Sequence, residues 1–224
     1  ERLAAGIVLR LLALYLREHR SLAATQVFLV VGSYLGGSYL LSVPGGVLAD
    51  GRLGHLRAAI AGVAFLLLGQ GALLADRALL IGPALLFMLV GAGLSRVTIP
   101  TLVGRLYGNH DERRESAFGL VYVAINVGYL AGPLCGEWMR ARYGWPPIFL
   151  VAVLALGIAF SILLSGRKLI ASATTNREVE ARLSPSHVAQ RVRAVYLLCG
   201  VAVVFWLAMQ QTSTSLSFLA EDGT

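Results

Sequence analysis

The stretch Ala78–Gly104 reads ALLIGPALLFMLVGAGLSRVTIPTLVG and contains a single charged residue, Arg96. A helix that crosses the roughly 30 Å hydrocarbon core of a bilayer needs about 20 predominantly apolar residues. Because backbone polar groups in lipid must be satisfied within the segment, this run predicts a membrane-spanning α-helix. Outer-membrane strands are about 10 residues long and alternate apolar with polar side chains, a pattern that this run does not show.

Other long runs without any charged residue recur along the chain: Ser21–Ala49, Ala58–Ala75, Ala117–Gly136, Trp145–Gly166 and Ala194–Ala220. The composition agrees, since 57% of the 224 residues are hydrophobic and only 14% are charged, against about 25% charged in soluble domains. The net charge of +7 is spread over short gaps between the runs, which disfavours a nucleic-acid-binding domain and a soluble enzyme. We therefore predict an all-α polytopic membrane protein.

The first apolar run is shorter. Leu3–Leu16 is interrupted by Arg10 and would rise only about 21 Å as a helix. We therefore expect the chain to begin part-way through helix one of a longer protein. Residues 1–166 are expected to form a six-helix bundle, polar residues 167–193 a cytoplasmic linker, and residues 194–224 the first helix of a second half.

The basic residues predict the orientation, because cytoplasmic loops are enriched in Lys and Arg. One side of the predicted membrane holds the larger group, Arg52, Arg57, Arg105, Arg113, Arg114, Arg167, Lys168, Arg177, Arg182, Arg191 and Arg193. The other side holds Arg17, Arg20, Arg77, Arg140 and Arg142. The missing start of the chain is therefore predicted to be cytoplasmic. The scarcity of Lys relative to Arg, with many Ala and Leu, suggests a high-GC bacterium, and we expect the protein to lie in its inner membrane.

The sequence contains no constellation of catalytic residues and no metal-ligand spacing, so we predict no enzyme, metal or cofactor. The two cysteines, Cys135 and Cys199, lie in apolar runs and are interpreted as small packing residues. The histidines, His19, His55, His110 and His187, lie in loops or helix flanks. We expect all four to be solvated.

A loop motif follows the second run. Gly45–Arg57 reads GGVLADGRLGHLR and places Gly46, Asp50 and Gly54 at intervals of four residues. Glycine permits close helix approach and a tight turn, and Arg57 could pair with Asp50 or with a helix end. The motif resembles the loop between helices two and three of the major facilitator superfamily. It departs from that pattern because Gly51 stands where a basic residue usually follows the Asp.

Four further blocks narrow the resemblance. They are ERLAAGIVLRLLALYL at the N-terminus, GAGLSRVTIPTLVGRLY at 91–107, AFGLVYVAINVGYLAGPL at 117–134 and FWLAMQQTSTSLSFLA at 205–220. In this order and spacing they resemble the proton-dependent oligopeptide transporter (POT) family over essentially the whole chain. The resemblance implies the N-terminal half of a twelve-helix transporter plus helix seven. It also implies peptide and proton as ligands and the missing C-terminal half as a partner.

The resemblance assigns proton coupling to helix one. Glu1 and Arg2 match the last two letters of the family's Glu-x-x-Glu-Arg motif. Being adjacent, they point about 100° apart on a helix, so they need not pair, and one is expected to meet another helix. Ala5 and Gly6 replace the family's aromatic pair, and Arg10 lies one position later than its second Arg.

Further substrate-contacting positions follow from the resemblance. Tyr39 has the spacing of the family's helix-two Tyr, Arg96 stands where helix four has a Lys, and Asn126 matches an Asn on helix five. Gln210 stands where helix seven usually has an acid. Arg stays charged and Gln does not ionise, so an Arg96–Gln210 pair cannot couple to protons. We expect coupling to depend on helix one or to be weakened.

Each of these positions also has another interpretation. Arg96 could cap carbonyl groups or extend toward the cytoplasm, Tyr39 could be an interfacial anchor, and Asn126 could bond one helix to another. The functional hypothesis is a proton-coupled importer of di- and tripeptides that works by alternating access. Two alternatives stay open: a major facilitator transporter of another solute, such as a drug or a nitrate-like anion, and a truncated membrane protein that does not transport.

Overall fold

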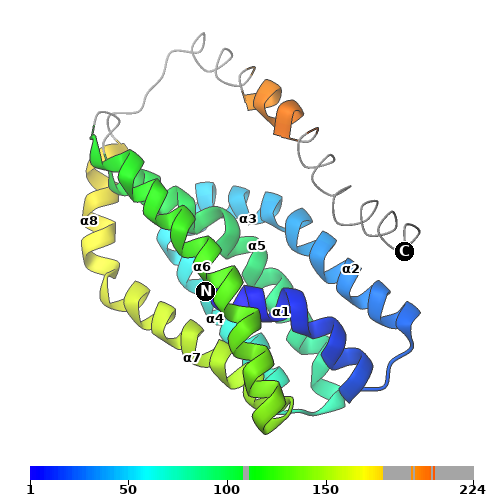
Figure 1. Ribbon diagram of the computed structural model, residues 1–224. Coiled ribbons are helices and arrows are strands. Elements are labelled where there is room, and N and C mark those ends of the chain that lie inside the picture. The colour runs from blue at the N-terminus through cyan, green and yellow to red at the C-terminus, as the bar shows by residue number, and fades with distance from the viewer. Residues whose placement is uncertain (108–110, 179–192, 194, 203, 205–224) are drawn as a thin grey trace, which may run out of the picture. The chain divides into compact units, whose positions relative to one another are not determined.

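The computed structural model describes residues 1–107, 111–178, 193, 195–202 and 204 (Figure 1). The chain divides into two units, residues 1–177 and residues 178–224. The described part of the second unit is helical over residues 195–202. The first unit is a bundle of helices, and no strand occurs among the residues that the structure describes.

The helices of the bundle follow one another through short connections. In chain order they are α1 (Arg2–Leu14), the π-helical turn η1 (Tyr15–His19), α2 (Ala24–Leu40), α3 (Ser42–Leu48), the π-helical turn η2 (Ala49–Leu53), α4 (His55–Leu74), the 3-10 turn η3 (Ala78–Leu80), α5 (Ile81–Leu106), α6 (Arg113–Tyr143), α7 (Pro146–Ser165) and α8 (Arg167–Glu178).

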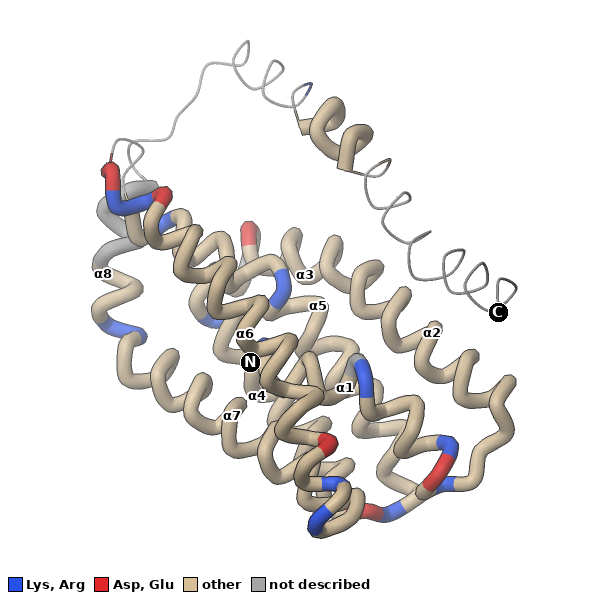
Figure 2. The backbone as a smooth tube through the Cα atoms, viewed as in Figure 1, with Lys and Arg blue, Asp and Glu red and all other residues tan. Residues whose placement is uncertain are grey.

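Five described segments are long and apolar enough to cross a membrane: Ala24–Gly51, His55–Leu74, Ala78–Leu106, Arg113–Tyr143 and Pro146–Ser165. Each coincides with a span predicted from the uncharged runs, and the all-α membrane fold is confirmed. The predicted span 194–220 lies largely outside the described residues. Figure 2 shows most described charged residues of the bundle near the ends of its helices, as the lipid environment requires.

Two details differ from the continuous helices and the polar linker that the sequence predicted. The run Ser21–Ala49 is divided at Leu41 into α2 and α3, and the chain then passes through η2. Ser42 contributes to this irregularity, because its hydroxyl donates to the Ser38 carbonyl at 2.9 Å and side-chain bonds of this kind bend helices. The predicted linker also begins with a helix, α8.

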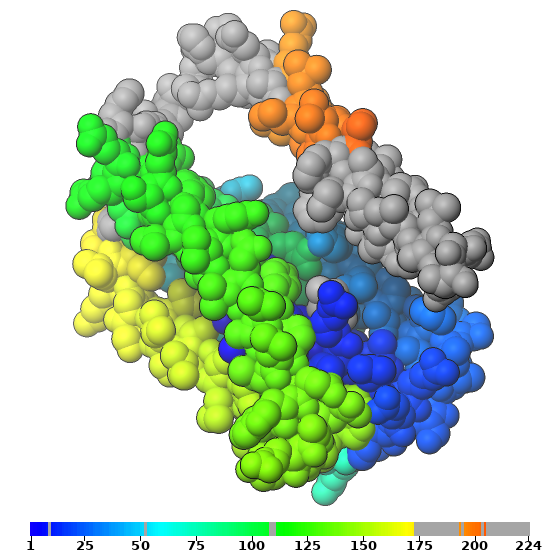
Figure 3. Space-filling view, in the orientation of Figure 1, coloured from blue at the N-terminus to red at the C-terminus, as the bar shows by residue number. Residues whose placement is uncertain are grey.

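The core lies between α1, α4, α5 and α7. Ile7, Leu12, Met88, Phe149 and Leu156 are at most 1% exposed and belong to one apolar cluster. The closest helix pairs are α4 with α5 and α1 with α6, and α7 contacts both α4 and α1. The outer face of α6, which runs across the front of Figure 3, is by contrast apolar and exposed at positions such as Leu120 and Leu130.

Small residues bring the paired helices together. A Cβ on Gly128 of α6 would lie 2.9 Å from the backbone nitrogen of Leu3 on α1, and one on Gly62 of α4 would lie 2.9 Å from that of Ser95 on α5. Because backbone lies directly against backbone, these positions require glycine. Helix association in membranes relies on such contacts, since lipid removes the hydrophobic driving force between helices.

Candidate functional site

A cavity of about 90 Å³ lies inside the bundle, between α1 on one side and α2, α4 and α5 on the other. Its polar and charged lining comes from Glu1, Arg2, Tyr34, Ser38, Tyr39, Gln70, Arg96 and Tyr129. The remaining lining is Ala4, Ala5, Val8, Leu35, Leu66, Met88, Ala92 and Leu156. The predicted residues Glu1, Arg2, Tyr39 and Arg96, which come from three different helices, therefore meet at one cavity.

Arg96 is held against α2. Its guanidinium carbon lies 3.8 Å from the ring centroid of Tyr39, a cation–π contact, and its Nη2 donates to the Ser38 hydroxyl at 3.2 Å. Its Nε is buried and has no hydrogen-bond partner. Arg96 thus brings a positive charge, with one unpaired buried N–H, to the lining of this cavity.

Glu1 and Arg2 are paired, which sequence spacing did not require. Arg2 Nε lies 3.1 Å from Glu1 Oε2, and Arg2 Nη1 donates to the Tyr129 hydroxyl of α6 at 3.4 Å. The expectation that one of the two would meet another helix agrees with the second contact. A carboxylate with its own cation therefore stands at the same cavity as Arg96.

Arg10, Asn126 and Gln210 are not brought to this cavity by the described structure. Arg10 is exposed on α1. Asn126 is exposed on α6, and its Nδ2 donates to the Tyr122 carbonyl one turn earlier at 2.8 Å. Gln210 lies outside the described residues. The assignments of these three residues to a substrate site remain predictions.

Sequence reasoning missed four polar members of the cavity lining, Tyr34 and Ser38 on α2, Gln70 on α4 and Tyr129 on α6. Gln70 is only 1% exposed, and its Oε1 has no hydrogen-bond partner. A lone Gln within an apolar run carries no sequence signal about the direction it faces. Only the packing of α4 against α5 and α7 shows that it lines the cavity.

The loop motif is built around a glycine and a histidine. Gly54 has φ +76° and ψ 149°, a backbone conformation essentially restricted to glycine. A Cβ added at Gly46 would lie 3.6 Å from the side chain of Val97 on α5. Asp50 pairs with His55, whose Nε2 lies 3.2 Å from Oδ1, while Arg57 is exposed. The prediction that His55 is solvated is wrong, because the first turn of α4 buries its side chain to 5% exposure.

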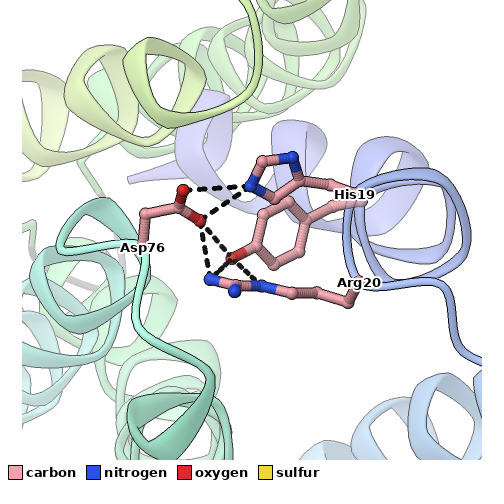
Figure 4. Close-up of polar contacts among 4 residues, drawn as sticks. His19, Arg20 and Asp76 are labelled. Carbon is pink, nitrogen blue, oxygen red and sulfur yellow. Dashed lines mark hydrogen bonds and ion pairs between the residues drawn. The ribbon is translucent and has the colours of Figure 1, made fainter.

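A second polar cluster links the end of helix one to the α4–α5 connection (Figure 4). Asp76 accepts from the buried Tyr15 hydroxyl at 3.0 Å and from Arg20 Nη2 at 2.6 Å, and it bonds His19 Nε2 at 3.0 Å. Burial raises the pKa of Asp76, but the hydrogen bonds from His19 and Tyr15 and the neighbouring charges outweigh this, so the pKa is below its ordinary value. His19 is exposed, as expected from the sequence, and it also bonds Asp76.

The chain is similar to known membrane transport proteins. The profile of the Major Facilitator Superfamily matches residues 2–222. "Peptide transporter YePEPT" of Yersinia enterocolitica is 37% identical over 125 residues, 54% of this chain and 24% of that protein. "Dipeptide and tripeptide permease A" of Klebsiella pneumoniae is 28% identical over 151 residues, 66% of this chain and 30% of that protein.

Solved structures show the same fold. A crystal structure of the peptide transporter POT in complex with sulfate superposes with a TM-score of 0.74 at 23% identity, covering 94% of this chain and 43% of that one. A POT family transporter in complex with 5-aminolevulinic acid gives a TM-score of 0.71 at 22% identity, covering 95% of this chain and 45% of that one. The matched part is less than half of each relative.

The chain therefore belongs to the major facilitator superfamily, a class of multi-pass membrane transporters. Within that superfamily, the relatives to which the chain is similar are named peptide transporters, and the solved structures with the same fold include POT family transporters. The superfamily drawn from the loop motif is confirmed, and the named peptide transporters agree with the narrower resemblance drawn from the four sequence blocks.

Proposed function

We propose that this chain forms the N-terminal half of a proton-coupled importer of di- and tripeptides that works by alternating access. The observation that carries the proposal is the convergence of Glu1, Arg2 and Arg96 on one cavity within an apolar bundle. Ionisable residues within membrane spans are costly and are found where a substrate or ion pathway needs them. The names of the peptide transporters to which the chain is similar supply the substrate class.

Arg96 is the proposed site for the carboxylate of a peptide. A guanidinium can hold a carboxylate with two parallel hydrogen bonds, and Arg96 lines the cavity with its positive charge. Tyr39 and Ser38 hold the rest of the side chain.

Proton coupling is proposed to act through Glu1. Protonation would remove the negative charge that faces Arg2 at 3.1 Å, freeing Arg2 for a new partner. Since Gln210 does not ionise, helix seven offers no equivalent carboxylate at that position. Coupling would therefore depend on helix one.

The remaining arrangement follows from the proposed function. The bundle 1–166, the cytoplasmic linker 167–193 and the following helix 194–224 would continue into a second half that supplies the opposing wall of the cavity. The excess of basic residues in one set of loops favours a cytoplasmic N-terminal side in a bacterial inner membrane.

Uptake measurements on the full-length protein test the proposal. Labelled dipeptide should accumulate in proteoliposomes when the outside is acidic and much less without a proton gradient. Arg96→Ala should abolish uptake at equal expression, Arg96→Lys should retain a part because it keeps the charge but loses the fork, and Arg77→Ala, an exposed loop variant, should match the wild type. Unchanged uptake by Arg96→Ala would remove Arg96 from the site.

Glu1→Gln tests the coupling step. It should still exchange peptide across the membrane but lose accumulation driven by the gradient, and gradient-driven accumulation in Glu1→Gln would contradict the assignment. Transport of another solute is the competing function, because Ala5 lines the cavity at a position where family members show an aromatic residue. Inhibition of transport by hydrophobic cations but not by dipeptides would favour that function.

A further inference from the structure

Gln70 stands out in the cavity because it is fully buried and incompletely hydrogen-bonded. Its side chain is 1% exposed, it lines the cavity, and its Oε1 has no partner. A buried carbonyl oxygen without a donor destabilises the protein that contains it. Replacement by an apolar side chain of similar size would remove that cost, so its presence calls for a donor that arrives from the cavity.

The surroundings of Gln70 specify the kind of donor. Leu66, one turn earlier on the same helix, and Met88, which packs against the neighbouring Gly69, both line the cavity with it. A charged group placed beside these side chains would lose its hydration. An ammonium group would find a better partner in the carboxylate of Glu1. A neutral acceptor in an apolar setting therefore suits a neutral N–H donor.

We propose that Gln70 Oε1 accepts a hydrogen bond from the peptide-bond N–H of a substrate whose carboxylate is held by Arg96, which makes Gln70 a specificity-determining residue. The inference rests on the proposed function. It explains why an acceptor on Gln70 and a donor on Arg96 both lie unpaired at one cavity. A peptide offers the complementary donor, its backbone N–H, and the complementary acceptor, its carboxylate, in one molecule, whereas the ester linkage of an analogue has no N–H donor at that position.

The test combines a side-chain change with a substrate change. Alanyl-alanine and its ester analogue alanyl-lactate compete with a labelled dipeptide for binding to the full-length wild type and to Gln70→Leu. The wild type should prefer the peptide by about tenfold, the effect expected of one hydrogen bond to an otherwise unpaired group. Gln70→Leu should lose that preference by weakening peptide binding alone.

Gln70→Leu should also raise the thermal unfolding temperature of the substrate-free protein, because the uncompensated acceptor is gone. Ser95→Ala is the matched control: Ser95 is likewise buried with an unpaired oxygen on a neighbouring helix, but it does not line the cavity. It should leave both affinities unchanged.

Each outcome decides between the possibilities. Equal weakening of peptide and ester in Gln70→Leu would assign Gln70 to a bound water or to the shape of the cavity, and would overturn the inference. Unchanged binding of both would do the same. If the wild type binds neither compound, the proposed function itself fails. If the wild type binds both compounds without preference, the inference about Gln70 fails but the proposed function stands.

Discussion

Replacing Gly132 by alanine should loosen the contact between α1 and α6. A Cβ at this position would meet the Leu3 carbonyl oxygen, and it would lie 3.0 Å from the Ile7 nitrogen and 3.3 Å from the Gly6 carbonyl carbon. All three are backbone atoms, so no side-chain rotation relieves the contact. Overpacking of this kind costs about 1–3 kcal/mol, while the higher helix propensity of Ala returns up to about 1 kcal/mol. When the full propensity gain is subtracted, the net loss in the free energy of unfolding is about 0–2 kcal/mol, and relative to a glycine-to-alanine change without the contact it is about 1–3 kcal/mol.

Gly119→Ala is the matched control on the same helix, because nothing lies within 4 Å of an added Cβ there. Only the propensity gain applies, so this variant should be as stable as the wild type or more stable by up to about 1 kcal/mol. The two variants are compared by thermal unfolding of the purified protein in detergent. Equal unfolding temperatures for Gly132→Ala and Gly119→Ala would refute the backbone contact between α1 and α6.

Three further predictions concern the site and the loops. Asp76→Asn should lower the free energy of unfolding by about 1 kcal/mol at neutral pH. Because folding lowers the pKa of Asp76, this difference from the wild type should persist at pH values above the ordinary pKa of Asp and vanish as acid protonates Asp76. Unfolding curves measured at a series of pH values would show this. Gly54→Val should lower the free energy of unfolding by about 1–3 kcal/mol, because Gly54 has φ +76° and valine is strained in that conformation. An unfolding temperature equal to that of the wild type would contradict the positive φ at this position. Tyr39→Leu should weaken dipeptide uptake several-fold by releasing Arg96, whereas Tyr39→Phe, which keeps the ring, should retain uptake; equal uptake by the two variants would exclude the cation–π contact.

The helices were predictable because one physical effect dominates them. A long apolar run has few alternatives to a membrane helix, so the spans agree with the structure over most of their length. The break at Leu41 was not predictable, because it depends on local hydrogen bonds such as that of Ser42 and not on composition. The burial of His55 likewise depends on the turn at Gly54.

The site was partly predictable for a related reason. Arg96 is the one charge within its run, and an isolated charge in an apolar segment indicates function without any knowledge of packing. Gln70 and Asn126 are both lone amides in apolar runs, yet the first lines the cavity and the second bonds to its own helix. Residue type cannot separate these two outcomes, since the direction of each side chain depends on its neighbours in three dimensions.

The pairing of helices through glycine has a consequence for how this half can move. Backbone packed on backbone leaves α1 and α6 little freedom to slide separately, and the same holds for α4 and α5. The charged cavity lies at the seam between these two pairs, with α7 in contact with both α1 and α4. Widening or narrowing of the space between α1 and α4 therefore involves displacement of each pair as a unit, while α2, which forms another wall of the cavity, is not tied to either pair by such a glycine contact.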